Sequence, residues 1–368
     1  MAEAVALALT GLSSLMLGLA IGSREGLQAR VDRLLATLPE SDPDQPQDAA
    51  SAARGLPDLT GLGLGASLRD VKLKHRFSLR QLRKATGKWA EERLIGSGAA
   101  ADVYRGVSAR GGEEWAVKRA KQPSRQFEKE VRAMAAVAGT AGVSHHPNLL
   151  PLLGFCSVAD VFRNCRYEQI LVFEFMPNGG LDKWIGEDAP RALSMSERMA
   201  ILMGAGVGLE YLHSIDMVHG NVKPANILLD ATMQAKVAHM ATRRVASGSS
   251  GYVDPGYVTS QNATPPVDVY SFGMVILEVI TGKKAPAEAA AAENGEGKSP
   301  SQRCGSPNLQ LWVAELLESL DHPSHLLVAM AQLAQSCTGE CTTARPTMKQ
   351  VLAEMQVIKD RHLPAVTN

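Results

Sequence analysis

Net charge is the first thing that this sequence lacks. Its 368 residues carry 38 Lys and Arg against 38 Asp and Glu, so no overall field favours nucleic acid as a partner. Cysteine is scarce, and its five positions are scattered: Cys156, Cys165, Cys304, Cys337 and Cys341. No His or further Cys pair accompanies the last two at a zinc-ligand spacing. We therefore expect reduced thiols in a reducing compartment.

Charge is also absent from one long apolar run near the start. Residues 4–21 contain no charged side chain and just reach the length that crosses a bilayer. Arginines follow the run whereas Glu3 precedes it, and positive residues after a span keep the following chain in the cytosol. We expect residues 1–22 to be a membrane anchor with the rest cytoplasmic. The alternatives are a signal peptide and a buried or surface helix; only the helix would leave the protein cytoplasmic.

Residues 23–68 have little of the pattern of a folded domain. Within 25–38 an apolar residue recurs at spacings of four, three and four, which predicts a short amphipathic helix; the stretch is too short to establish a coiled coil. Pro, Asp, Ala and Gly then dominate up to residue 67, a composition typical of a flexible linker. Residues 69–88 are basic. They could meet anionic lipid beside a membrane or form a solvated helix face.

A glycine-containing turn is predicted between two strands near residue 98. Residues 96–103 read G-S-G-A-A-A-D-V, and glycine lets a backbone approach phosphate closely because it has no Cβ to collide. Alone, this pattern is weak evidence. It gains weight because W-A-V-K, ending at Lys118, follows on a predicted strand, and F-E-K-E-V, containing Glu130, follows on a predicted helix.

Four further features follow from residue 170 onward. An apolar run at 170–173 predicts a buried strand, which P-N-G-G at 177–180 ends. A helix that is apolar almost throughout is predicted at 199–213, and it should be buried. The loop H-G-N-V-K-P-A-N comes directly after it at 219–226, and D-V-Y-S-F-G lies at 268–273.

These motifs, in this order, resemble those of protein kinases. The lead-in F-S-L-R-Q-L-R-K-A-T at 77–86 is similar to that of plant receptor-like kinases in particular. The resemblance implies an α+β, two-lobed protein kinase-like fold at 69–360, with a small β-rich N-lobe at about 89–176 and a larger helical C-lobe at about 177–360. The apolar segment and linker would precede it, and a tail at 361–368 would follow.

The resemblance also implies an ATP site. Lys118 would hold the phosphates and pair with Glu130. Backbone groups of Glu174 and Met176 would meet the adenine, and Phe173, a core residue in either case, would line the back of the pocket. The cofactor-binding residues that the resemblance carries over are Ile95, Gly96, Gly98, Val103, Ala116, Lys118, Glu130, Phe173, Glu174, Met176 and Leu228.

The catalytic half lacks two carboxylates that the resemblance requires. Asn221 replaces the aspartate that accepts the substrate proton, and losing such a base costs on the order of 10²–10⁴-fold in rate. His239 replaces the metal-binding aspartate of D-F-G, although Mg²⁺ prefers oxygen ligands. Residues 231–251 contain no Asp, so no realignment restores this ligand. Asn226, a weak metal ligand at most, and Lys223 are kept.

Two other replacements agree with this pattern. Gly220 takes the place of the arginine that pairs with a phosphorylated activation segment. Gly256 takes the place of a glutamate whose partner in the family corresponds to Arg345, so we expect Arg345 to be without that partner. Asp268, which the resemblance implies holds the backbone of the catalytic loop, is kept.

Two functions are compatible with these residues. The first is a catalytically impaired pseudokinase that binds ATP weakly, with little dependence on Mg²⁺, and acts as a membrane-associated signalling scaffold or allosteric partner. Its partners would be other signalling proteins, such as an active receptor kinase, and membrane lipids through residues 69–88; nucleic acid is not expected. The alternative is an active ATP-dependent Ser/Thr kinase, which Lys118, Glu130, Lys223 and Asn226 favour.

Overall fold

The computed structural model describes residues 75–108, 111–122, 125–140, 146–160, 166–239, 252–254, 257, 263–283 and 324–363. All of them belong to one compact unit, Asp70–Asn368. The anchor, amphipathic helix and linker expected before residue 75 lie outside these residues, as does Gly256. No helix within the described residues is both long and apolar enough to cross a membrane.

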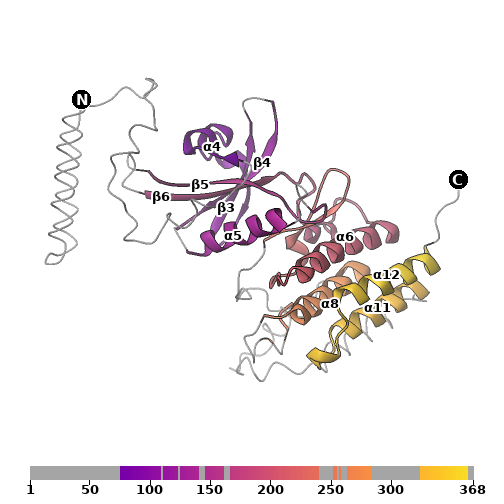
Figure 1. Cartoon of the computed structure of the whole chain (residues 1–368). Coiled ribbons are helices and arrows are strands. Elements are labelled where there is room, and N and C mark those ends of the chain that lie inside the picture. Colours follow the sequence, from indigo (N-terminus) through magenta and orange to yellow (C-terminus); the bar gives the residue numbers. More distant parts are fainter. Residues whose placement is uncertain are drawn as a thin grey trace, which may run out of the picture. The chain divides into compact units, whose positions relative to one another are not determined.

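The first part of the described chain forms a six-stranded sheet in the order β1-β5-β6-β4-β3-β2 (Figure 1). Strands β2 to β6 are antiparallel, and the short β1 joins β5 in parallel at one edge. The bounds are β1 His75–Arg76, β2 Leu94–Ser97, β3 Ala101–Val107, β4 Glu114–Ala120, β5 Leu152–Asp160 and β6 Arg166–Glu174. This sheet is the β-rich N-lobe that the sequence predicts.

Strands β3 and β4 divide their side chains between the two faces of the sheet. Successive residues of a strand point to opposite faces. Tyr104 and Val117 are buried on one face, in a cluster with residues of the lead-in. Val103, Ala116 and Lys118, at alternate positions, are only half-buried. The residues expected to bind the cofactor therefore share the face that the core leaves open.

The lead-in to the lobe is folded against the first of these faces. Helix α4 (Leu79–Ala85) begins at Ser78, whose side chain accepts a hydrogen bond from the backbone of Gln81. Leu82 is fully buried, and the ring of Phe77 meets that of Trp115 edge-on at 5.2 Å. The segment before residue 89, with β1 and α4, thus packs on the sheet of the N-lobe.

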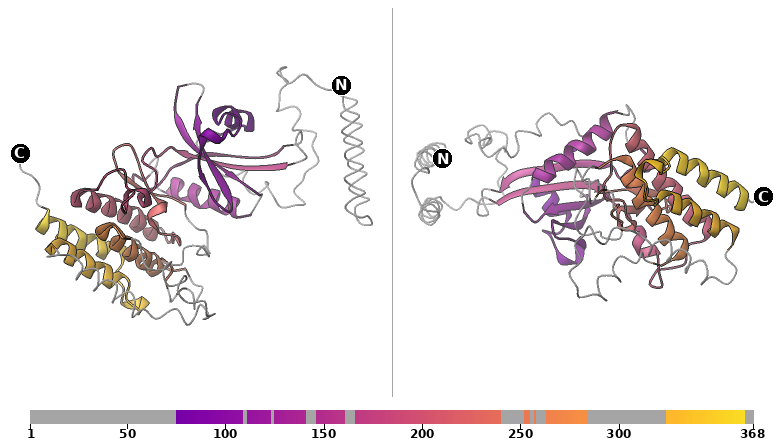
Figure 2. Two further views of the ribbon diagram at one scale, coloured as in Figure 1. Left: turned by 180° about the vertical axis from the view of Figure 1, so that it is seen from behind. Right: turned by 90° about the horizontal axis from the view of Figure 1, so that it is seen from below.

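Helix α5 (Arg125–Thr140) lies on the opposite face of the sheet from α4 (Figures 1 and 2). The helical C-lobe follows. Its long helices are α6 (Met195–Ser214), α8 (Pro265–Thr281), α11 (His325–Cys337) and α12 (Met348–His362). Helix α11 packs beside both α8 and α12 (Figures 1 and 2). The expected two-lobed kinase fold is therefore present.

Helix α6 shows how the sequence sets this packing. Ser194 and Glu197 form a capping box at its start, which satisfies backbone N–H groups that the first turn leaves without partners. Gly208 lets the helix approach the segment before β5, because a Cβ there would lie 2.6 Å from the carbonyl oxygen of Asn148. The helix contributes Leu209 and seven further buried residues to the C-lobe, as its apolar sequence predicts.

Candidate nucleotide site and altered catalytic loop

The glycine-containing turn joins β2 to β3. Its closing hydrogen bond runs from the Gly98 amide to the Ala101 carbonyl at 3.0 Å. Packing within the chain does not require glycine here: a Cβ at Gly96 would lie 3.9 Å from the nearest atom, on Val103, and one at Gly98 would lie 3.8 Å from the nearest, the Ala101 carbonyl oxygen. Ile95 is 43% exposed. The turn therefore leaves room for the close approach of a ligand, which is the use of glycine that phosphate binding requires.

Lys118 and Glu130 meet between β4 and α5. The Lys118 ammonium donates to both carboxylate oxygens, at 2.8 and 3.0 Å. Exposed fractions of 21% and 10% for the two side chains place the pair at the border of the core. A phosphate in front of the sheet could therefore reach Lys118 while Glu130 holds its side chain in position. The structure brings together the two charged residues that the sequence proposes for the site.

The residues expected around the adenine gather where β6 ends. Phe173 and Met176 are buried, whereas Glu174 is half-buried. Phe173 is the cross-strand neighbour of Ala116. Leu228, also half-buried, lies on β7 (Ile227–Leu229) and forms an isolated bridge with Gly180, just beyond the end of β6. Residues from both lobes thus converge in the arrangement that the resemblance implies.

Asp268 organises the loop at 219–226. Its carboxylate accepts hydrogen bonds from the backbone amides of His219 and Gly220, both at 2.7 Å. It also lies 2.9 Å from the Nε2 atom of His213. Gly220 has a φ of 69°, a conformation that glycine adopts without strain. The predicted anchoring of the loop by Asp268 is confirmed.

His219 closes the loop onto the chain that follows β8 (Ala235–Val237). Its Nδ1 is 3.2 Å from the Asn221 amide, which donates to it. Its Nε2 must then carry the hydrogen and donate to the Ala238 carbonyl at 2.9 Å. Complete burial lowers the pKa of His219, although the nearby Asp268 carboxylate opposes the shift. The imidazole is therefore neutral and structural.

The two asparagines of the loop bond to each other rather than presenting a base. The Asn226 side-chain amide donates to the Asn221 carbonyl at 2.7 Å, and the Asn226 carbonyl accepts from the Ala238 amide at 2.8 Å. The resemblance assigns Asn221 to the position of the proton acceptor. An amide side chain is not a base at neutral pH, so Asn221 itself cannot accept a proton there.

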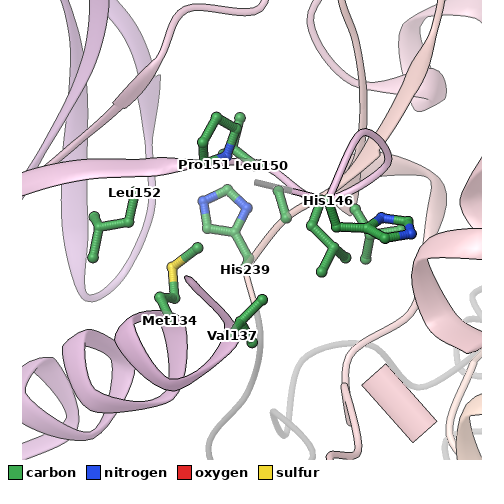
Figure 3. Close-up of a pocket in the computed structure, with 10 residues that line it drawn as sticks. Met134, Val137, His146, Leu150, Pro151, Leu152 and His239 are labelled. Atoms are coloured by element: carbon green, nitrogen blue, oxygen red, sulfur yellow. The ribbon is translucent and has the colours of Figure 1, made fainter. Parts of the chain in front are cut away.

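His239 points into a small pocket beneath α5 (Figure 3). The lining includes Met134 and Val137 of α5 and Leu150 and Leu152 near the start of β5. The cavity measures ≈ 20 Å³, about the space of one water molecule. The Nδ1 atom of His239 is buried and has no hydrogen-bond partner within the described residues.

The charge state of His239 follows from this burial. Desolvation lowers its pKa to about 3, and the positive charges of Lys118 and Lys223 act in the same direction. The ring is therefore neutral at physiological pH. A neutral nitrogen ligand beside two lysines is unsuited to Mg²⁺, which binds oxygen. The described part of the chain also contains no group of three or more His, Cys, Asp or Glu residues that could hold a metal ion.

The structure corrects the expectation for Arg345. Its guanidinium forms a two-point ion pair with the carboxylate of Asp254, at 2.7 and 2.9 Å. Both side chains are 1% exposed. Arg345 also donates to the carbonyls of Gly339 and Pro266, and it lies over the ring of Tyr270 at 5.0 Å. The partner expected two residues later, at 256, is thus replaced by an aspartate of the same segment.

The sequence motifs also did not predict a second ion pair. Arg119 of β4 donates to both carboxylate oxygens of Glu168 on β6, at 2.8 and 2.6 Å. The guanidinium lies 4.8 Å from the ring centre of Trp89, in the lead-in. The two residues of each pair lie far apart in the sequence, by 49 and 91 positions, so no local pattern signals either contact. The sequence signal closest to this pair is the position of Arg119, which directly follows Lys118 on a largely apolar strand.

Comparison with known proteins points to one family. The model of the protein kinase domain matches residues 89–356. Cysteine-rich receptor-like protein kinase 38 of Arabidopsis thaliana is 35% identical over 303 residues, which are 76% of this chain and 43% of that protein.

Two further relatives are receptor kinases from other plants. Leucine-rich repeat receptor protein kinase MSL1 of Oryza sativa subsp. japonica is 31% identical, over 77% of this chain and 21% of that protein. Chitin elicitor receptor kinase 1 of Physcomitrium patens is 30% identical, over 80% of this chain and 48% of that protein. The chain spans less than half the length of each of these three relatives.

Proposed function

We propose, on the premise that the chain belongs to the protein kinase domain family and is related to plant receptor-like kinases, that it binds ATP without catalysing phosphoryl transfer efficiently. The observation that carries the proposal is His239, a buried, neutral imidazole at the position where the family has a metal-binding carboxylate. The binding is expected to be weak and to depend little on Mg²⁺.

The charge at the position of His239 supports this proposal. A carboxylate buried beside α5 without a cation would cost several kcal/mol or take up a proton. A neutral histidine avoids that cost, so this site needs no metal to be stable. The ligand's phosphates must then be neutralised by protein groups, and Lys118, held by Glu130, is in position to do so.

The replacements at positions 221 and 239 should both lower the rate of phosphoryl transfer. Asn221 removes the general base, which costs on the order of 10²–10⁴-fold. His239 removes a metal ligand, and the metal ions of phosphoryl transfer neutralise the charge that develops in the transition state. Because the two losses affect different parts of the reaction, they should compound. ATP binding requires neither residue.

The test separates binding from chemistry. Purified full-length chain is mixed with ATP plus Mg²⁺, ATP plus EDTA, or no nucleotide, and its melting temperature is measured. We expect a small ATP-dependent rise that EDTA leaves in place. Absence of a rise, or a rise that requires Mg²⁺, would contradict the proposal. His239→Asp should make the rise more dependent on Mg²⁺, and exposed Lys349→Gln serves as the control.

An active Ser/Thr kinase is the second candidate, favoured by the intact pair of Lys118 and Glu130. Radiolabelled phosphate transfer to a general protein substrate, with Mg²⁺ or Mn²⁺, distinguishes it. Activity in the wild-type chain that Lys118→Met abolishes would support this candidate over the first. Activity that survives Lys118→Met would indicate a contaminating kinase instead.

A retained fold with poor chemistry suits a protein that acts by binding others. We infer a membrane-associated signalling scaffold or allosteric partner, whose kinase-like domain faces the cytoplasm and contacts an active receptor kinase. Two observations support this inference: the relatives are named as receptor kinases, and residues 4–21 form an uncharged run. Cell fractionation tests it: full-length chain recovered in the soluble fraction would remove the membrane claim.

A further inference from the structure

Helix α4 presents a row of basic side chains away from the N-lobe. Arg80 and Lys84 are exposed and lie four residues apart, on one side of the helix. Lys88, also exposed, follows after the helix ends. Within the described residues no ion pair or side-chain hydrogen bond engages any of the three. We call these three residues the basic row.

The buried side of the same helix fixes the direction of the row. Leu82 is fully buried. Leu82 and Ala85 pack in one buried cluster with Tyr104 and Val117 of the sheet, and the Arg93 guanidinium donates to the Ala85 carbonyl at 3.0 Å. With α4 held on the sheet in this way, the helix cannot roll to hide its charges. The basic row is a permanent outward surface of the lobe.

The local charge is strongly positive although the whole chain is neutral. From 75 to 93 the sequence has six Lys and Arg (76, 80, 83, 84, 88 and 93) and two carboxylates, Glu91 and Glu92, which stand in the short helix η4 (Glu91–Arg93) after the row. On the sheet beneath, Arg105 is paired with Glu114 and Arg119 with Glu168. No acidic residue lies between 75 and 90 to neutralise α4.

We propose that the basic row docks the N-lobe on an anionic membrane surface. Charge complementarity supports this occupant, because juxtamembrane basic clusters are attracted to anionic lipid headgroups at the cytoplasmic leaflet. The place of the row in the chain supports it as well: an uncharged run of bilayer length lies upstream, at 4–21, on the same polypeptide. The inference rests on the membrane association proposed above and adds the contact that orients the lobe.

The test uses full-length protein and two kinds of vesicle, phosphatidylcholine alone and phosphatidylcholine mixed with phosphatidylserine. An apolar run enters both, so the extra binding to the phosphatidylserine vesicles measures electrostatic docking. Arg80→Gln with Lys84→Gln should reduce that extra binding about 25-fold, about fivefold for each charge. Lys349→Gln with Arg361→Gln removes the same charge from exposed positions of α12 and should leave it unchanged.

Salt gives a second measurement that needs no variant. The extra binding of the wild-type chain should disappear at about 1 M salt, where the Debye length falls to about 3 Å. Equal loss in the α4 and α12 variants, or binding that salt leaves intact, would overturn the docking role of α4. Equal binding to the two vesicles would also overturn it and would point to an acidic protein segment as the occupant. Recovery of the chain in the soluble fraction, by contrast, would remove only the proposed anchor.

Discussion

Two regions of the molecule each contain a lysine with different surroundings. The first is the candidate nucleotide site, which contains Lys118, and the second is the loop at 219–226 with the chain up to His239, which contains Lys223. Lys118 is held by both oxygens of Glu130. Lys223 stands in a loop whose neighbours are Asn221 and the buried, neutral His239. Lys118 in the first region has a carboxylate partner, whereas positions 221 and 239 of the second carry no carboxylate. The backbone of the loop is held by Asp268, so its fold does not require carboxylates at those two positions.

The largest expected effect concerns the buried ion pair between Asp254 and Arg345 in the C-lobe. Asp254→Ala or Arg345→Ala would leave a buried charge without its partner, and breaking such a pair costs about 3–5 kcal/mol. Equilibrium unfolding in urea measures the loss. A loss of unfolding free energy below about 1 kcal/mol would mean that the stability of the C-lobe does not depend on this pair.

The second largest effect concerns Lys118 and the affinity for ATP. Lys118→Met should weaken ATP binding at least tenfold, because a hydrogen bond to a charged group contributes about 1.5–3 kcal/mol. Isothermal titration of the nucleotide gives the affinity. Lys349→Met is the control, since that lysine is exposed on α12, in the other lobe. Equal weakening in both variants would show that Lys118 has no special role.

The third effect is a dependence of folding stability on pH, which arises from His239. The pKa of His239 is lowered to about 3 in the folded chain, against about 6.5 when unfolded. The unfolded chain therefore gains a proton first as pH falls, and stability present above pH 6.5 is lost towards pH 3. From pH 7 to 5 this loss is about 2 kcal/mol.

Comparison with a variant isolates the contribution of His239. Urea unfolding at pH 7, 6 and 5 should give a shallower loss of stability for His239→Gln than for the wild-type chain. His219, whose pKa is also lowered, adds to the slope in both proteins and cancels in the difference. Identical slopes would mean that His239 is not buried as Figure 3 shows.

The smallest effect belongs to an exposed ion pair of the N-lobe. Arg105 and Glu114 are paired on β3 and β4, with side chains 50% and 34% exposed. Exposed pairs contribute roughly 0–1 kcal/mol, so Arg105→Gln should change urea stability by less than about 1 kcal/mol. A change as large as that of Arg345→Ala would indicate that burial does not explain the difference between the two pairs.

Much of the site could be predicted from sequence because its residues belong to short motifs. Lys118, Glu130 and Asp268 each stand in a recognisable local pattern, and the backbone path of the family brings them into place. Asp254 could not be assigned in this way. It lies 91 residues from Arg345, and spacing alone favoured a glutamate position two residues later over the carboxylate that actually faces the arginine.

The sequence by itself determined the two-lobed architecture, the glycine turn, the Lys118 position and the absence of Asp from 231–251, since each of these depends on residue identity and local order. The tertiary structure alone decided that α4 joins the N-lobe, that His239 turns into the pocket under α5, and that Asp254 pairs with Arg345. Those outcomes depend on which side chains the folded backbone brings within a few ångströms, and burial then sets their charge and their cost.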